Sequence, residues 1–188
     1  MRYDIKETAR EAMRVELANA ALDLMVEHGY EQTANELADA LGISRATFFR
    51  HLGSKEEIFT AVMIGPVDLF AASYAAASTG KVRSWQVVRA AFDTVTAATE
   101  SAPDRMRSRY RLIRSIPSLG GRLRRARFPQ IEQLAAALTA DGYEVFQASI
   151  VATAAVAVFD QCWALWAADE GASLSEIVDR AFAELTLI

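Results

Sequence analysis

The stretch TANELADALGISRATFFRHLGSK, residues 33–55, decides the fold of this chain. Thr33 and Glu36 have the spacing of a capping box, in which each side chain accepts a hydrogen bond from the other residue's backbone N–H. Apolar residues then recur at helical spacing, so we expect a helix over 34–41 with one buried face. Gly42 follows at once, where the end of a helix requires a positive φ that glycine adopts at least cost.

A second short helix is expected over 45–51, because Ser44 is a good N-cap residue. Its Phe48 points inward, and six residues are left mostly outward: Arg45, Ala46, Thr47, Phe49, Arg50 and His51. No acidic residue lies between Asp39 and Glu56, which suits a helix placed among phosphates. Two short helices around a turn of about three residues match a DNA-binding helix-turn-helix. A plain αα-corner has the same spacing, so both interpretations stay open at this point.

An amphipathic helix is expected over 8–28, just before the helix pair. The three helices together would form an N-terminal headpiece. Ser54 and Glu57 then repeat the capping-box spacing and predict the start of a further helix. The sequence therefore favours two domains, a headpiece over 1–53 and a second helical domain over 54–188.

The composition favours a well-packed globular protein, with 188 residues, 52% of them apolar, and a mean hydropathy of +0.10. Few prolines, glycines and β-branched runs predict an all-α fold. The longest apolar run, residues 150–159, is too short to span a membrane, and charged residues after Met1 speak against a secretory segment. The lone Cys162 fits a reducing compartment. We expect a cytoplasmic protein with no membrane partner.

The charge of the chain gives no general support for binding to nucleic acid. The net charge is −4, and residues 1–60 carry seven Lys or Arg against eleven Asp or Glu. Such a protein should bind random DNA poorly and depend on specific contacts, doubled by dimerisation. The balance counts against a histone-like coat and is compatible with a sequence-specific regulator.

An arginine-rich segment stands out in the second half of the chain. Residues 105–127 contain nine arginines and no acidic residue. A solvated or salt-bridged surface is the commonest use of such a charge run. A subsite for an anionic effector and a second nucleic-acid surface are the two alternatives.

Further helices are expected over 54–75 with a break at Pro66, 84–100, 104–116, 119–138 with a break at Pro129, and 143–168. The last of these is expected to be the longest, and it is apolar on two sides. One side can face its own domain and the other a partner subunit. Ser173 starts a final helix, and two such helices from each subunit would form the four-helix interface of a homodimer.

Residues 29–59, GYEQTANELADALGISRATFFRHLGSKEEIF, resemble the DNA-binding segment of the TetR family of transcriptional regulators. The turn, the aromatic pair, the basic-aromatic tail and Ser-Lys-Glu-Glu fall in the family's order, whereas the rest of the chain matches only as architecture. The resemblance implies a homodimeric regulator, most simply a repressor, that binds a palindromic double-stranded DNA operator. It also implies that a small-molecule effector in the C-terminal domain releases the DNA.

Carried over by position, the resemblance implies that Thr33 and Lys55 contact phosphates. The first residues of the second short helix would face base edges, with Arg45 best suited to a guanine. Phe49 departs from the family pattern, because Tyr is commoner there and its hydroxyl binds a phosphate, whereas Phe49 offers only packing or a thymine-methyl contact. The expected DNA-contacting residues are Thr33, Ser44, Arg45, Ala46, Thr47, Phe49, Arg50, His51 and Lys55.

The effector site is expected among large aromatic side chains that would also suit a plain core: Trp85, Phe92, Tyr110, Phe128, Phe159 and Trp163. Asp160 and Gln161 interrupt a buried helix, where either side chain orients a ligand or reaches solvent. This interior favours an apolar or aromatic effector. The metal-assisted effector mode known in the resembled family uses histidines of the C-terminal domain, whereas His28 and His51 both lie in the headpiece. We therefore expect no effector metal, and no cofactor is expected.

Two other functional classes compete with a regulator. An enzyme is disfavoured, because the chain has one cysteine and no histidine after His51. Cys162 is more simply a small buried hydrophobe than a redox-sensing thiol. A helical adaptor that keeps the helix-turn-helix only as a scaffold is the remaining alternative. Arg45 discriminates, since its loss should weaken DNA binding only in a regulator.

Overall fold

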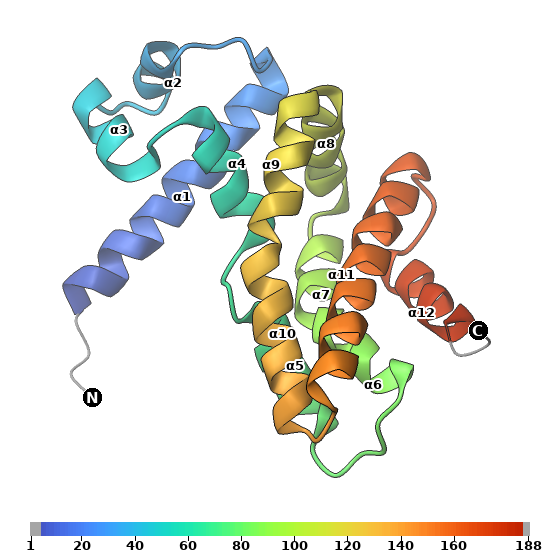
Figure 1. The fold of residues 1–188 in the computed structure, drawn as a ribbon. Helices are drawn as coiled ribbons and strands as arrows, with labels where there is room; N and C mark the ends of the chain where they lie inside the picture. Colours follow the sequence, from blue (N-terminus) through green and yellow to red (C-terminus); the bar gives the residue numbers. More distant parts are fainter. Residues whose placement is uncertain (1–4, 186–188) are drawn as a thin grey trace. The chain divides into compact units, whose positions relative to one another are not determined.

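The computed structural model describes residues 5–185, and every regular element within that range is a helix (Figure 1). The all-α fold predicted from the sequence is therefore confirmed. The chain forms two compact units. The N-terminal unit comprises residues 1–65 and 108–125, and the C-terminal unit comprises residues 66–107 and 126–188.

The helices of the N-terminal unit are α1 (Ile5–His28), α2 (Ala34–Ala40), α3 (Arg45–Leu52), α4 (Lys55–Ile64), the second half of α8 (Pro103–Ser115) and nearly all of α9 (Pro117–Ala126). The three headpiece helices match their predicted ranges closely, although α1 begins at Ile5 rather than near residue 8. The unit does not follow the single boundary expected after residue 53. α4 packs against α1, and residues 108–125 contribute side chains to the same core.

The residues at the helix ends form the capping interactions that the sequence predicted. The capping boxes of Thr33 and Ser54 are both complete, and Ser44 caps α3. Gly42 and Gly53 have φ angles of 68° and 64°, in the left-handed region that favours glycine. These residues fix where each helix begins and ends, so the relation of α2 to α3 is set by short-range chemistry.

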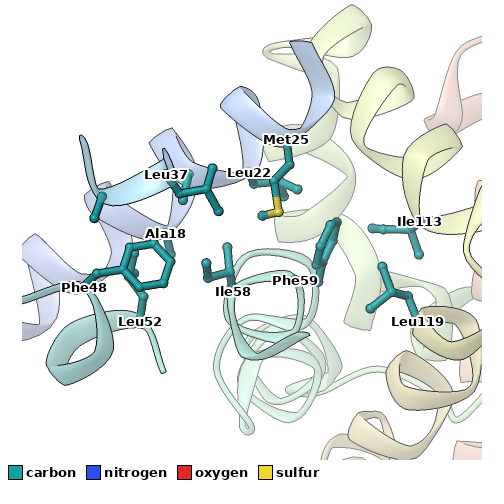
Figure 2. Packing of buried hydrophobic residues seen from close by; sticks show 12 residues of the cluster. Ala18, Leu22, Met25, Leu37, Phe48, Leu52, Ile58, Phe59, Ile113 and Leu119 are labelled. Atoms are coloured by element: carbon teal, nitrogen blue, oxygen red, sulfur yellow. The ribbon is translucent and has the colours of Figure 1, made fainter. Parts of the chain in front are cut away.

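The core of the N-terminal unit joins residues that are far apart in the sequence (Figure 2). Leu22 and Met25 of α1 are fully buried with Phe59 of α4. Ile113 and Leu119, from α8 and α9, complete the cluster, and each is only 1% exposed. Since burial of such side chains is the main stabilising term, residues 108–125 are an integral part of this unit.

The helices of the C-terminal unit, besides the first part of α8, are α5 (Leu69–Ser78), α6 (Trp85–Arg89), the 3₁₀ turn η1 (Ala90–Phe92), α7 (Asp93–Glu100), α10 (Phe128–Ala140), α11 (Val145–Ala168) and α12 (Leu174–Glu184). The predicted breaks near Pro66 and Pro129 are present, between α4 and α5 and between α9 and α10. The helix expected over 84–100 is interrupted by η1. α11 was expected to be the longest helix, but α1 equals it at 24 residues.

The C-terminal unit has an aromatic core. α10 packs against both α5 and α11, and α11 also packs against α12. Phe92 stacks on Phe159, with ring centres 4.4 Å apart, and Phe70 and Phe182 lie against Phe92 at 4.9 and 5.6 Å. We call these four residues the phenylalanine cluster.

Two stretches are long and apolar enough to cross a membrane by length and composition alone, Lys55–Ser78 and α11. The first is interrupted between Ile64 and Leu69. The core helix of a soluble protein passes the same test, and α11 has nine buried residues against its neighbours in this fold. The high hydropathy of α11 therefore has an explanation within the unit.

Candidate nucleic-acid interface

The outer face of α3 presents a continuous set of side chains to solvent. Phe48 is buried, as predicted, and together with buried Leu52 it anchors the helix to the unit's core. The side chains of Arg45, Ala46 and Arg50 are exposed. Thr47 and His51 are half-buried at the edges of this face. Its size and its arginines suit insertion into a major groove.

Arg45 and Phe49 form a stacked pair on the exposed face. The guanidinium carbon of Arg45 lies 5.5 Å from the centre of the Phe49 ring, and the ring remains 47% exposed. Phe49 in turn meets the edge of buried Phe48, at 5.7 Å between ring centres. The ring therefore restricts Arg45 to fewer conformations, which lowers the entropy that the guanidinium would lose on binding a partner.

The side chains of Ser44 and Thr33 complete the ends of their own helices. The Thr47 N–H donates to Ser44 Oγ at 3.1 Å, and the two hydroxyl oxygens of these residues are 2.9 Å apart. Thr33 Oγ1 donates to Glu36 Oε2 at 2.8 Å. Hydrogen bonds from the Thr33 backbone and side chain lower the pKa of Glu36. Both expected contact residues are exposed, so a phosphate can approach either helix end.

Lys55 is engaged within the protein. Its Nζ donates to the carbonyls of Tyr30 and Gln32 at 2.6 and 2.9 Å and lies 4.2 Å from the centre of the Tyr30 ring. The Tyr30 hydroxyl donates to Glu56 at 2.9 Å, and burial, aided by this bond, raises the Tyr30 pKa to about 12. Lys55 therefore holds the α1–α2 turn against the start of α4. An ammonium has three donors, so one can still serve a phosphate.

Three of the nine arginines of the arginine-rich segment are buried, so a surface role describes only part of the segment. Arg107, Arg109 and Arg127 are 5%, 2% and 8% exposed. Arg109 lies in the N-terminal unit, where it pairs with Asp23 at 2.8 Å and donates to the Asn19 side chain at 2.9 Å. Buried charges persist only when paired and hydrogen-bonded, and these arginines meet that condition.

Arg127 forms a polar site beside the phenylalanine cluster. Its Nε is 3.2 Å from Asp160 Oδ1, and its guanidinium carbon lies 5.2 Å from the centre of the Phe70 ring. Burial lowers the Arg127 pKa, although Asp160 opposes the change. Arg127 also donates to Gln130 at 2.8 Å, and Gln130 Nε2 donates to the Pro66 carbonyl at 2.8 Å. Asp160, expected as a polar interruption of a buried helix, thus neutralises a cation that lies just before α10.

The six aromatic residues expected at an effector site do not form one group. Phe92 and Phe159 are buried in the phenylalanine cluster, and half-buried Trp85 lies 6.1 Å from Phe182. Trp163 packs against Trp166 instead. Two others lie outside the interior of the C-terminal unit. Tyr110 belongs to the N-terminal unit, and Phe128 is 60% exposed at the start of α10.

Several interior residues were missed from the sequence. Phe70 lies in an alanine-rich stretch with little helical periodicity, and Phe182 lies in the last helix, far along the chain from the other aromatic residues. Arg127 is one of nine arginines in residues 105–127, so its residue type did not distinguish it from the exposed arginines. The signal for Arg127 was its place one residue before a helix that buries Leu134 and Leu138.

Cys162 is buried in α11, and burial raises its thiol pKa to about 11. The thiolate is the reactive form of cysteine, so this environment disfavours a redox sensor.

Comparisons with known proteins agree with this arrangement. A sequence model described as bacterial regulatory proteins of the tetR family matches residues 17–62. A second model, described as the MftR C-terminal domain, matches residues 82–187. The first match includes the whole helix-turn-helix, and the second includes more than half of the chain.

Solved structures share the fold over nearly the whole chain at low sequence identity. The fatty acid degradation regulator FadR from Bacillus halodurans has a TM-score of 0.62 and 13% identity, over 89% of this chain and 95% of its own. FadR from Bacillus subtilis, solved with stearoyl-CoA, has a TM-score of 0.61 and 15% identity, over 92% and 96%. Thermus thermophilus FadR, solved with lauroyl-CoA, has a TM-score of 0.57 and 23% identity, over 92% and 93%.

The two sequence models, the helix-turn-helix and the all-helical C-terminal unit lead to one assignment. The chain belongs to the TetR family of transcriptional regulators.

Proposed function

We propose that this protein is a repressor that binds a palindromic DNA operator as a homodimer and releases it when a small molecule binds the C-terminal unit. The observation that carries the proposal is the exposed face of α3, where Arg45 is stacked on Phe49 and two further basic side chains follow. The proposed contacts are those expected from the sequence, with Arg45 reading a base and Thr33 and Lys55 binding phosphates. Arg50 would lie near the DNA backbone. Such a regulator would act in the cytoplasm.

A homodimer is supported by the outward face of α11. Phe146, Ile150 and Leu165 are 73%, 55% and 54% exposed, although all three are large apolar residues. Exposed Thr153 and Ala157 extend the stripe from Ile150 at helical spacing, and exposed Gln161 separates Ala157 from Leu165. An apolar stripe of this length is costly in water, and a second copy of the same helix would cover it.

The proposed effector combines an apolar body with an anionic group. The apolar part of the proposed site is the buried phenylalanine cluster, and the adjacent Arg127 is a buried cation whose carboxylate partner is Asp160. The Bacillus subtilis and Thermus thermophilus relatives were solved with stearoyl-CoA and lauroyl-CoA, which have this combination. An anion that binds Arg127 would compete with Asp160.

The first experiment measures DNA binding. Wild-type protein selects duplexes from a random-sequence library, and fluorescence anisotropy compares a selected duplex with its scrambled counterpart. We expect a palindromic preference, and Arg45→Ala should cost about 1–3 kcal/mol of affinity for the selected duplex. Equal affinity for scrambled DNA, or no effect of Arg45→Ala, would favour the helical adaptor. Release of the selected duplex by lauroyl-CoA, weakened in Arg127→Met, tests the effector class.

A further inference from the structure

The net charge of the proposed DNA-binding unit is positive, although that of its first 65 residues is negative. Residues 1–65 carry seven basic against eleven acidic residues, an unfavourable balance for DNA. Residues 108–125 belong to the same compact unit and add six arginines and no acid. The N-terminal unit therefore has thirteen basic and eleven acidic residues, whereas the C-terminal unit has seven and thirteen.

This arginine segment is held firmly in the unit. Ile113 and Leu119 are buried in its core beside Phe59 (Figure 2). Arg109 is paired with Asp23 of α1 and bonded to Asn19. The exposed arginines of α8 and α9 are therefore fixed relative to the helix-turn-helix, because they share its core.

Five of these six arginines are exposed, namely Arg111 and the four that the test below replaces: Arg114, Arg122, Arg124 and Arg125. Arg122 lies close enough to Tyr30 and Glu56 to interact electrostatically with both. Glu56 is the second residue of α4, next to Lys55. The positive charge of Arg122 on α9 is therefore close to the start of α4. There Lys55 holds the α1–α2 turn and is expected to meet a phosphate.

We propose that exposed arginines of α8 and α9 form a second phosphate-binding surface of the N-terminal unit, which binds the DNA backbone flanking the sequence read by α3. This inference rests on the proposed DNA-binding function and adds to it. Residues 108–125 contain no acidic residue to compete with phosphate, and they supply the positive charge that residues 1–65 lack. The contacts of this surface are to the backbone, so they contribute affinity without sequence preference.

The test compares salt dependence among variants that each remove one positive charge. Arg114→Gln, Arg122→Gln, Arg124→Gln and Arg125→Gln are made singly and together, with Arg180→Gln, at an exposed position of α12 in the C-terminal unit, as a control. Affinity is measured between about 50 and 200 mM salt for a duplex selected by wild-type protein. The duplex is used with long flanks and trimmed to the selected sequence. Circular dichroism melting checks that each variant keeps the wild-type stability.

The combined variant should show a less steep dependence of log K on log salt on the long duplex, by about 0.9 for each phosphate that it no longer neutralises. Arg180→Gln should match wild type, and the preference over scrambled DNA should not change. On the trimmed duplex, wild type and the combined variant should converge. If the combined variant keeps the wild-type slope while Arg45→Ala binds weakly, the second surface is rejected and the proposed function stands. If wild type shows no preference for the selected duplex, both are rejected.

Discussion

Arg107 places its guanidinium carbon 4.4 Å from the centre of the Trp166 indole ring, and the same guanidinium donates to the carbonyls of Asp169 and Ala172 at 3.2 and 3.0 Å. These carbonyls lie in the turn that follows α11. One arginine from α8 therefore caps the C-terminal end of α11 and fixes the path into α12.

Replacement of Arg107 by Met should destabilise the protein by about 2–3 kcal/mol, because it leaves partly buried carbonyls without a donor and removes a stacked cation. Urea unfolding followed by tryptophan fluorescence measures this loss. Arg180→Met, at an exposed position of α12, is the matched control and should unfold like wild type. Equal midpoints for the two variants would show that Arg107 does not cap α11.

Lys55 should contribute to stability as well as to DNA affinity. Lys55→Met removes the donor to the Tyr30 and Gln32 carbonyls, and we expect a loss of about 1–2 kcal/mol in the free energy of unfolding. Arg50→Met removes one exposed charge nearby and should lower DNA affinity without changing stability. A Lys55→Met protein of wild-type stability with weakened DNA binding would make Lys55 a phosphate contact only.

Phe49→Tyr should strengthen binding to a selected duplex. A hydroxyl on this exposed ring can donate to a phosphate, and one added hydrogen bond gives about 1 kcal/mol, or roughly a fivefold gain in affinity. Phe49→Leu should instead weaken binding, because it removes the ring beneath Arg45. Anisotropy titrations of both variants test this pair of effects. Tighter binding by Phe49→Leu would contradict the supporting role of the ring.

The stripe of α11 should determine the oligomeric state. Phe146→Glu places a charge in the proposed dimer interface, and we expect dissociation to monomers at micromolar concentration in analytical ultracentrifugation. Val82→Glu, in a loop residue that is 87% exposed, is the control and should sediment like wild type. A wild-type protein that is already monomeric, or a dimeric Phe146→Glu protein, would place the interface elsewhere.

The carboxylate of Glu100 should make the free energy of unfolding depend on pH under acidic conditions. Its Oε1 accepts hydrogen bonds from Ser173 Oγ at 2.7 Å and from the Ser175 N–H at 3.0 Å, and these bonds lower its pKa below the ordinary 4.5. The folded state therefore holds this proton less tightly than the unfolded state does. The stabilisation is present above about pH 4.5 and is lost as the pH falls through the lowered value.

We expect Glu100→Gln to be less stable than wild type at neutral pH and to approach it as the pH falls well below the ordinary carboxyl value. Urea unfolding at several pH values measures the difference. Glu184→Gln, at an exposed position near the end of α12, should show no such convergence. A difference between Glu100→Gln and wild type that stays constant with pH would exclude this linkage.

The helix-turn-helix could be predicted almost residue by residue, because its signals are local. Thr33, Ser44 and Ser54 each cap the helix that follows them, and Gly42 closes α2. Every partner in these motifs lies within a few residues, so spacing alone identifies it. The breaks at the prolines were predictable for the same reason.

The arginine partners could not be predicted, because they lie far away in the chain. Arg109 pairs with Asp23 across 86 residues, and Arg127 pairs with Asp160 across 33. Other arginines lie two residues from each of them, so the residue type alone does not show which side chains are buried. The exposure of Phe128 was missed for a related reason: its type suggested a core residue, but its place in the tertiary structure is at the surface.

The N-terminal unit is assembled from two separate pieces of chain, and this limits how the regulator can be divided. A fragment ending near residue 65 would lack Ile113 and Leu119 and would leave Phe59 exposed. Likewise, a chimera that joins this DNA-binding part to another family member's sensor by one splice would leave the core incomplete. A transferable DNA-binding module would have to carry residues 108–125 as well. The first segment of the C-terminal unit, residues 66–107, lies in the sequence between the two pieces of the N-terminal unit. Evolution is therefore expected to exchange the two units less freely than it would exchange domains joined by a single linker.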